Sequence, residues 1–335
     1  MTKADGYRRV AIACQGGGSH TAFTAGALKT LLGQEGAERH GDYEVVALSG
    51  TSGGAICALL AWQGMLMKDP GRIVEALDAF WKDNSAGSLW ERLLGDWLLQ
   101  SSRLFASVGG PPVISPYLYP SWTQEILRDM LDRHVDFERI GELAGPSSLM
   151  LLVGAVDVLS GVFKAFDSRT DRIDVDVILA SAALPTLFRA VHSGGGVYWD
   201  GLFSQNPPVR ELTDARPDEI WVIQINPQER DAEPRSMAHI MDRRNELAGN
   251  LSLYQELYFI EKVNQWVAQG SLSGTSHRVI EVKWLPMLRE LDAESKLDRD
   301  PAFIEELMAY GERQAAEFLS SEFRRPPGKG DWTTG

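Results

Sequence analysis

The chain has 335 residues, of which 44% are hydrophobic and 24% are charged, a composition typical of a globular protein. Its formal net charge is −13, and a field of that sign repels nucleic acids and anionic lipid surfaces, so neither is an expected partner. Only two cysteines are present, Cys14 and Cys57, which excludes a disulfide scaffold and a four-thiolate zinc site. Both lie in apolar runs, so we expect buried thiols in a reducing, cytoplasmic compartment.

No long apolar stretch points to a membrane span. None precedes the first predicted strand, so no signal peptide is expected. The longest apolar-rich stretches, residues 55–67 and 149–158, are shorter than the roughly 18–20 residues that a span needs. The chain is therefore not expected to cross a membrane. Peripheral contact with a membrane surface stays an open alternative.

The first elements alternate between strand and helix. Apolar and β-branched runs predict strands at residues 9–14 and 43–48. Apolar residues at three- and four-residue spacing predict helices at 20–32, 53–62 and 71–81. This order is typical of a parallel sheet with right-handed crossovers, and so of an α/β fold.

An insert at residues 86–122 interrupts the alternation. It is rich in tryptophan, leucine and tyrosine, and prolines at 111, 112, 116 and 120 break it up. One interpretation is a helix packed on the core and followed by an ordered loop. The other is an apolar lid, or a wall for an acyl chain, over an active site.

The second half of the chain predicts further strands and two helices. A long helix at 236–269 and a final helix at 301–319 belong to a C-terminal helical part over 236–323. The tail, 324–335, is rich in glycine and proline and is expected to be disordered. Since no repeat or linker is visible, residues 1–323 are interpreted as one domain. The strands are predicted at 149–156, 162–166, 197–199, 220–225 and 278–282.

A Gly-x-Ser-x-Gly motif lies where a strand turns into a helix, in the stretch VVALSGTSGGAICALL at residues 45–60. Such a turn holds its central residue at positive φ, and the flanking Gly50 and Gly54 avoid collisions there. Ser52 would project into a cleft at the carboxyl edge of the sheet, facing the positive end of the next helix. The motif alone also occurs in ordinary glycine-rich turns, but the strand–helix context favours a nucleophile.

A glycine run at residues 16–18 follows the first strand and precedes a helix. Its unhindered amides could stabilise an oxyanion. A plain tight turn is an alternative. A dinucleotide fingerprint is another, weaker one, because Thr21 replaces the third glycine although Asp42 or Glu44 could serve as its acidic residue. A P-loop is excluded, since no Gly-Lys-Ser/Thr follows.

A serine nucleophile needs a base. None of the six histidines lies in a motif that marks it, and the order Ser…Asp…His leaves His239 or His277 as generic triad candidates. Asp200 follows a short strand at an Asp-Gly turn. A lone Asp-Gly is usually only a turn, and a free aspartate, with a pKa of about 3.9, is a weak base. A direct Ser–Asp hydrogen bond in a water-poor pocket would still let it take the proton.

Four blocks of the sequence together resemble the patatin-like phospholipases and acyl hydrolases, over roughly the first 210 residues. They are GGGSHTAFTAG at 16–26, GTSGG at 50–54, ASAALPTLF at 180–188 and DGLFSQNPP at 200–208. The resemblance implies a three-layer α/β/α fold with a mostly parallel sheet and helical inserts. It also implies site roles: Ser52 as nucleophile, Asp200 as base, the amides of Gly16, Gly17 and Gly18 as oxyanion hole, and Gly50 and Gly54 in the nucleophile elbow.

The implied function is that of a serine acyl hydrolase: a lipase, phospholipase A or esterase that cleaves lipid esters through an acyl-enzyme, with no cofactor or metal. Two departures from the family pattern matter. His20 stands where Lys or Arg is usual, so the loop is expected to lack charge-assisted support and to be sensitive to pH. Leu202 replaces a small residue and would narrow the pocket. These two departures motivate one alternative function, that of a non-catalytic lipid- or effector-binding protein. The second alternative function is that of a Ser-His-Asp hydrolase. A lipid or small ester is the expected partner, and the sequence does not indicate the oligomeric state.

Overall fold

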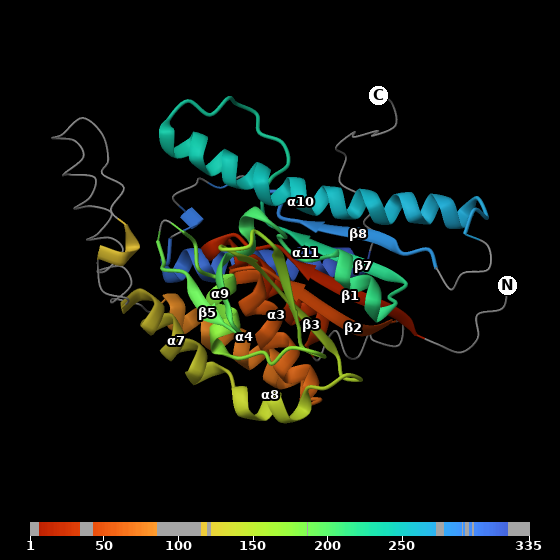
Figure 1. Ribbon diagram of the computed structural model, residues 1–335, viewed down its shortest axis with the longest axis horizontal. Coiled ribbons are helices and arrows are strands. Elements are labelled where there is room, and N and C mark those ends of the chain that lie inside the picture. Colours follow the sequence, from red (N-terminus) through yellow and green to blue (C-terminus); the bar gives the residue numbers. More distant parts are fainter. Residues whose placement is uncertain are drawn as a thin grey trace.

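The computed structural model describes residues 7–33, 43–85, 115–118, 122–185, 187–272, 278–289, 291, 295–296 and 298–320 (Figure 1). Of the insert expected at 86–122, it describes the short helix η4 (Pro116–Leu118) and the helix α7 (Trp122–His134) that begins at its end. The rest of a possible lid, and the tail expected to be disordered at 324–335, lie outside the described residues.

One eight-stranded sheet forms the centre of the fold. Consecutive strands in the order β5-β6-β3-β2-β1-β7-β8 are hydrogen-bonded to each other, and β4 pairs with β3. The central strands β3, β2, β1, β7 and β8 run parallel to one another, whereas β4, β5 and β6 are antiparallel to their partners. The strands are β1 (Arg8–Cys14), β2 (Tyr43–Gly50), β3 (Met150–Asp157), β4 (Phe163–Asp167), β5 (Val191–Ser193), β6 (Gly196–Asp200), β7 (Glu219–Gln224) and β8 (Glu281–Pro286).

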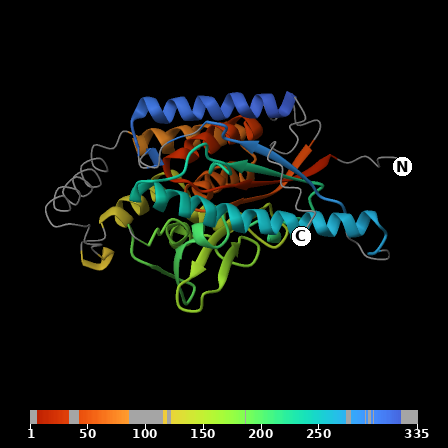
Figure 2. The ribbon, with the colours of Figure 1, turned by 90° about the horizontal axis from the view of Figure 1, so that it is seen from above.

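Helices cover both faces of this sheet (Figures 1 and 2). On β1, Val10, Ile12 and Cys14 pack into one apolar core, and the intervening Ala11 and Ala13 pack into the other. A strand buried on both faces is typical of parallel α/β sheets. The first core is covered by α1 (Ala22–Leu32), α3 (Gly53–Leu66), α4 (Pro70–Ser85) and α11 (Pro301–Ser320), and the second by α10 (Met237–Ala268). The expected α/β architecture is confirmed.

The last strand lies further along the chain than predicted. Its expected range was 278–282, but β8 begins at Glu281, which pairs with Glu219. The backbone amide and carbonyl of Ile280 instead bond the side chain of Asn264 on α10, at 2.9 and 2.7 Å. The Asn264 side chain therefore takes both backbone hydrogen bonds of Ile280, at a position where the sequence pattern predicts a strand.

Two short helices, α8 (Phe137–Leu143) and α9 (Val175–Ser181), complete the described α-helices. Each begins at an aspartate whose carboxylate accepts a hydrogen bond from the first turn, Asp136 for α8 and Asp174 for α9. Among the described helices, none combines the length and apolarity that crossing a bilayer demands.

Candidate active site

Strand β3 brings the ends of β2 and β6 together. Its residues 152–156 pair with β4 along one edge, so β2 and β6 share the other edge. The last residue of β2, Gly50, lies opposite Val153, and the last residue of β6, Asp200, lies opposite Ala155. Two residues along a strand span about 7 Å. The sheet register thus places the turn after Gly50, which carries Ser52, next to Asp200.

The turn at Ser52 has the strained geometry expected from the motif. Ser52 has φ 55° and ψ −131°, outside the regions that non-glycine residues favour, and α3 begins at the next residue. The glycines leave space for this turn. A Cβ at Gly50 would lie 2.6 Å from the Cα of Ala55, and one at Gly54 would lie 2.3 Å from the carbonyl oxygen of Cys14. Side chains at either position would force the turn apart.

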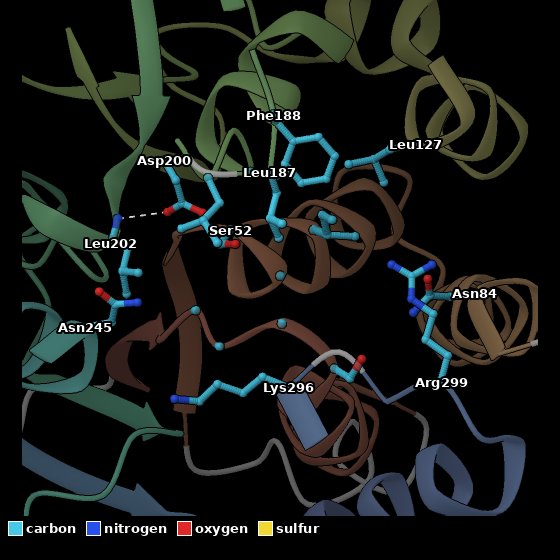
Figure 3. Close-up of a pocket in the computed structure, with 18 of the residues that line it drawn as sticks. Ser52, Asn84, Leu127, Leu187, Phe188, Asp200, Leu202, Asn245, Lys296 and Arg299 are labelled. Atoms are coloured by element: carbon cyan, nitrogen blue, oxygen red, sulfur yellow. Dashed lines mark hydrogen bonds between the residues drawn. The ribbon is translucent and has the colours of Figure 1, made fainter. Parts of the chain in front are cut away.

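Asp200 is a buried carboxyl group beside Ser52. It is 2% exposed, and its Oδ1 accepts a hydrogen bond of 2.8 Å from the Leu202 amide (Figure 3). Burial raises the pKa of Asp200 to about 7, against the opposing effects of the hydrogen bond from the Leu202 amide and of the nearby Ser52 side chain. A carboxylate with such a pKa is a far stronger base than a free aspartate.

The glycine run follows β1 and lies against Ser52, but its three amides are not equivalent. A Cβ at Gly16 would lie 3.0 Å from the Cβ of Ser52, so the loop and the turn are in close contact. The Gly16 amide, however, donates a hydrogen bond of 2.7 Å to Oδ1 of the buried Asn206. This differs from the expectation that all three amides face an oxyanion, because Gly16 already has an acceptor. Gly17 and Gly18 also line the pocket.

The histidine in this loop is neutral, which corrects the expected pH sensitivity. His20 is buried, and its Nε2 lies 2.8 Å from the Ser295 hydroxyl. Burial, together with the nearby positive charges of Lys296 and Arg230, lowers the pKa of His20 to about 3 against the opposing effect of the Glu246 carboxylate. The ring therefore carries no charge at neutral pH. A C-terminal segment closes over the loop here, since a Cβ at Gly18, with φ +59°, would lie 2.4 Å from the Lys296 carbonyl oxygen.

Of the two histidines proposed for a triad, only His239 lies within the described residues. His239 is exposed in the first turn of α10 and is not among the residues that line the pocket. His277 lies outside the described residues. Thr21, which replaces the third glycine of a dinucleotide fingerprint, donates to the Gly18 carbonyl and lies under Gly53. Across the described ranges, no group of three or more His, Cys, Asp or Glu side chains is arranged to hold a metal ion.

A cavity of about 220 Å³ opens beside Ser52 and Asp200 and has two unlike walls. One wall is apolar and comes from α3, α4, α7 and the segment after α9. Figure 3 shows Leu127 of α7 and Phe188 facing each other across this end. The other apolar side chains in this wall are Ile56, Phe80, Trp81, Met130, Leu184 and Leu187. Leu202, expected to narrow the pocket, is also part of its lining.

The opposite wall is polar and carries buried charges. The Glu246 carboxylate of α10 is fully buried and pairs with Arg230, Arg243 and Lys296 at 2.5, 3.2 and 3.3 Å. Asp242 adds pairs with Lys296 at 2.6 Å and Arg230 at 3.5 Å. Burial alone would raise the pKa of Glu246, but the hydrogen bond from Arg230 and the neighbouring cations hold it below its usual range. Three cations and two carboxylates leave this cluster with one net positive charge.

Several residues that shape the site were not singled out from the sequence. Ser181, Gln205 and Asn206 lie inside the blocks ASAALPTLF and DGLFSQNPP, so the resemblance marked their segments but not their contacts. Leu127 and Lys296 lie outside all four blocks, and no local pattern distinguishes them from ordinary helix or loop residues.

The family model described as patatin-like phospholipase matches residues 12–213. Among curated proteins, none matches this chain. Among solved structures, the chain is similar to VipD from Legionella pneumophila, with 14% sequence identity and a TM-score of 0.44, over 95% of this chain and 67% of that one.

Proposed function

Because this chain belongs to the patatin-like phospholipases, a family of lipid acyl hydrolases, we propose that it cleaves carboxylic esters of lipids with Ser52 as nucleophile and Asp200 as base. One observation carries this proposal: a strained serine and a buried carboxyl group with a pKa near 7 lie beside each other at the edge of a cavity, and the serine side chain is close enough to act on that pKa. A carboxylate in that state can accept the serine proton as the nucleophile attacks.

The proposed reaction has two steps. The Ser52 hydroxyl oxygen attacks the ester carbonyl carbon while its proton passes to Asp200. The tetrahedral oxyanion then collapses, and the leaving alkoxide takes the proton from Asp200, which frees the alcohol and leaves an acyl-Ser52 ester. In the second step water attacks this ester, gives a proton to Asp200 and releases the fatty acid, and the Ser52 oxygen recovers its proton.

The amides of Gly17 and Gly18 are the proposed donors to the oxyanion. All three glycines of the loop line the cavity, but the Gly16 amide is engaged by Asn206. Gly16 would then act by holding the loop against Ser52 rather than by donating itself. Losing one such donor typically costs about 2.7–4 kcal/mol of transition-state stabilisation, so each of the two amides is expected to contribute on that scale.

The two walls of the cavity suggest how a lipid would lie in it. The acyl chain would follow the apolar wall past Phe188 and Leu127, and the leaving alcohol would face the polar wall formed by α10 and Lys296. An amphiphilic ester suits both surfaces, which supports a lipid or small-ester partner. The acidic net charge favours contact with a neutral lipid surface over an anionic one. The free, buried thiols of Cys14 and Cys57 support a cytoplasmic location.

A fluorophosphonate probe tests the proposal. It should label the folded wild-type protein on the peptide that contains Ser52, and the Ser52→Ala variant should not be labelled. Asp200→Asn should abolish turnover of nitrophenyl esters, while the control Asp132→Asn, an exposed carboxylate on α7, should retain it. Folded protein that neither reacts with the probe nor hydrolyses esters would favour the alternative of a lipid- or effector-binding protein. Normal turnover by Asp200→Asn would favour a histidine triad.

A further inference from the structure

The segment after Asp200 ties together the three parts of the candidate site. The Thr51 hydroxyl, next to Ser52, donates a hydrogen bond of 2.6 Å to the Gln205 carbonyl. The side chain of the adjacent Asn206 accepts from the Gly16 amide at 2.7 Å. The backbone amide of Gln205 donates a hydrogen bond of 3.0 Å to the Gly201 carbonyl, which closes the turn. Both Gln205 and Asn206 are almost fully buried. A shift of these two residues would therefore move the serine turn and the glycine loop together.

Glu256 of α10 fixes this segment from outside. Its Oε1 accepts a hydrogen bond of 2.8 Å from the Gln205 side chain. Its Oε2 accepts from the amides of Val209 and Arg210, at 2.8 and 2.9 Å. One carboxylate thus binds both ends of residues 205–210. Charge-assisted bonds to a carboxylate are stronger than bonds between neutral groups, so this group is well suited to hold the segment in one position.

The same helix also holds the strand end before the glycine loop. Asn250 accepts a hydrogen bond of 2.9 Å from the Gln15 side chain, whose Oε1 in turn accepts from the amides of Ile225 and Asn226. The Asn226 side chain donates to the Gly16 carbonyl at 3.2 Å. Both anchors, Asn250 and Glu256, lie on α10 and beyond the residues that match the family, 12–213.

We propose that Glu256 is a positioning residue for the Ser52–Asp200 pair, acting through Gln205 and the segment that follows Asp200. The inference rests on the proposed function, because it assumes that Ser52 and Asp200 react. It adds that the pair depends on a carboxylate from a helix outside the matched family region. A displacement of the reacting groups by about 1 Å can cost roughly 10²-fold in rate, so loss of this anchor should act on kcat.

The test is a double-mutant cycle with Glu256→Gln and Gln205→Met, measured in the full-length protein. Glu256→Gln is nearly isosteric, but it replaces one accepting oxygen by an amide nitrogen. That nitrogen is itself a donor and faces a donor of the segment 205–210. Gln205→Met keeps the volume but loses the donor, and the Oε1 of Gln205 has no hydrogen-bond partner among the described residues. Active sites are counted with the fluorophosphonate probe, and kcat for nitrophenyl butanoate is expressed per labelled site. Glu261→Gln, which removes the same charge elsewhere on α10, is the matched control.

We expect kcat per labelled site to fall about tenfold or more for either single variant, with KM little changed. The double variant should lose no more than the worse single one, because both remove the 2.8 Å bond between Gln205 and Glu256, and the other contacts of the Gln205 donor, to Glu211, are longer at 3.4 Å. Unchanged kcat per site in both single variants, or losses that multiply, would overturn the inference even if thermal stability falls. If Glu256→Gln does not fold, Gln205→Met alone decides by the same readout. A wild-type protein without esterase activity would instead refute the proposed function.

Discussion

The Ser181 hydroxyl lies directly beneath the Ser52 turn and links it to the sheet. It accepts a hydrogen bond of 3.0 Å from the Ser52 amide and donates one of 2.7 Å to the carbonyl of Gly154. Gly154 is the β3 residue between the partners of Gly50 and Asp200. A single buried hydroxyl therefore connects the strained residue to the strand that aligns the two proposed catalytic groups.

Replacing this hydroxyl should weaken both stability and turnover. In Ser181→Ala the half-buried Ser52 amide and the buried Gly154 carbonyl each lose a partner, which typically costs about 1–3 kcal/mol. We expect the free energy of unfolding, measured by urea denaturation, to fall by that amount, and kcat to fall as the turn relaxes. The control is Ser320→Ala at the exposed end of α11. Wild-type stability and kcat in Ser181→Ala would show that the link has no energetic role.

Ester hydrolysis should depend on the ionisation of Asp200. Its pKa is about 7 because burial favours the neutral acid. Only the carboxylate can accept the Ser52 proton, so kcat/KM should rise about tenfold per pH unit below pH 7 and level off above it. The neutral His20, whose pKa is about 3, should add no second transition between pH 5 and 8. A flat profile over this range would contradict the assignment of Asp200 as base.

The same pKa predicts a stability change with a defined sign. In the unfolded chain Asp200 should titrate near 3.9, whereas in the folded chain its pKa is about 7. Between these values the folded state holds the proton more tightly, so this group's contribution to the free energy of unfolding falls as pH rises from 4 to 7. The loss is limited to about 4 kcal/mol, the equivalent of the whole pKa difference.

Asp200→Asn removes that titration. The stability of the variant relative to wild type should therefore increase between pH 4 and pH 7 and stay constant above pH 8. Denaturant unfolding of both proteins over this range measures the difference, in which the other titrating groups cancel. A difference that does not vary with pH would mean that Asp200 is not desolvated in solution.

Local sequence patterns were sufficient to predict the strained turn and most strands and long helices, but not the short elements β5, α8 and α9. Ser52 lies between a β-branched run and an alanine-rich run, and Gly50 and Gly54 are required by contacts within a few residues or with the neighbouring strand. Such short-range requirements leave a signature in the sequence. The strand at 278–282 was misplaced because Ile280 is satisfied by Asn264, a residue on α10 that no local pattern links to it.

The contacts that arrange the site could not be predicted in the same way. The bond from Gly16 to Asn206 joins residues 190 apart, and the sequence shows only that each lies in a block shared with the family. The loss of charge at His20 depends on burial and on Lys296, far along the chain. Partners of this kind are set by tertiary packing, so roles assigned from motifs need the structure before single amides or protons can be assigned.

The apolar end of the cavity should determine which acyl chains are accepted. Leu127 of α7 faces Phe188 there (Figure 3), and Leu127→Trp would fill the space between them. Each methylene group that no longer fits loses about 0.8 kcal/mol of transfer free energy. We therefore expect kcat/KM for dodecanoyl esters to fall about tenfold or more, while butanoyl esters are hydrolysed at nearly the wild-type rate.

A comparison of nitrophenyl esters of increasing chain length measures this preference, with Leu118→Trp as the control. Leu118 is 79% exposed and is not among the residues that line the cavity, so this variant adds the same side chain without filling the proposed acyl site. An equal loss for all chain lengths in Leu127→Trp would indicate general damage to the site. An unchanged preference would place the acyl chain elsewhere, because a ring that blocks the path between Leu127 and Phe188 must discriminate against the chains that need it.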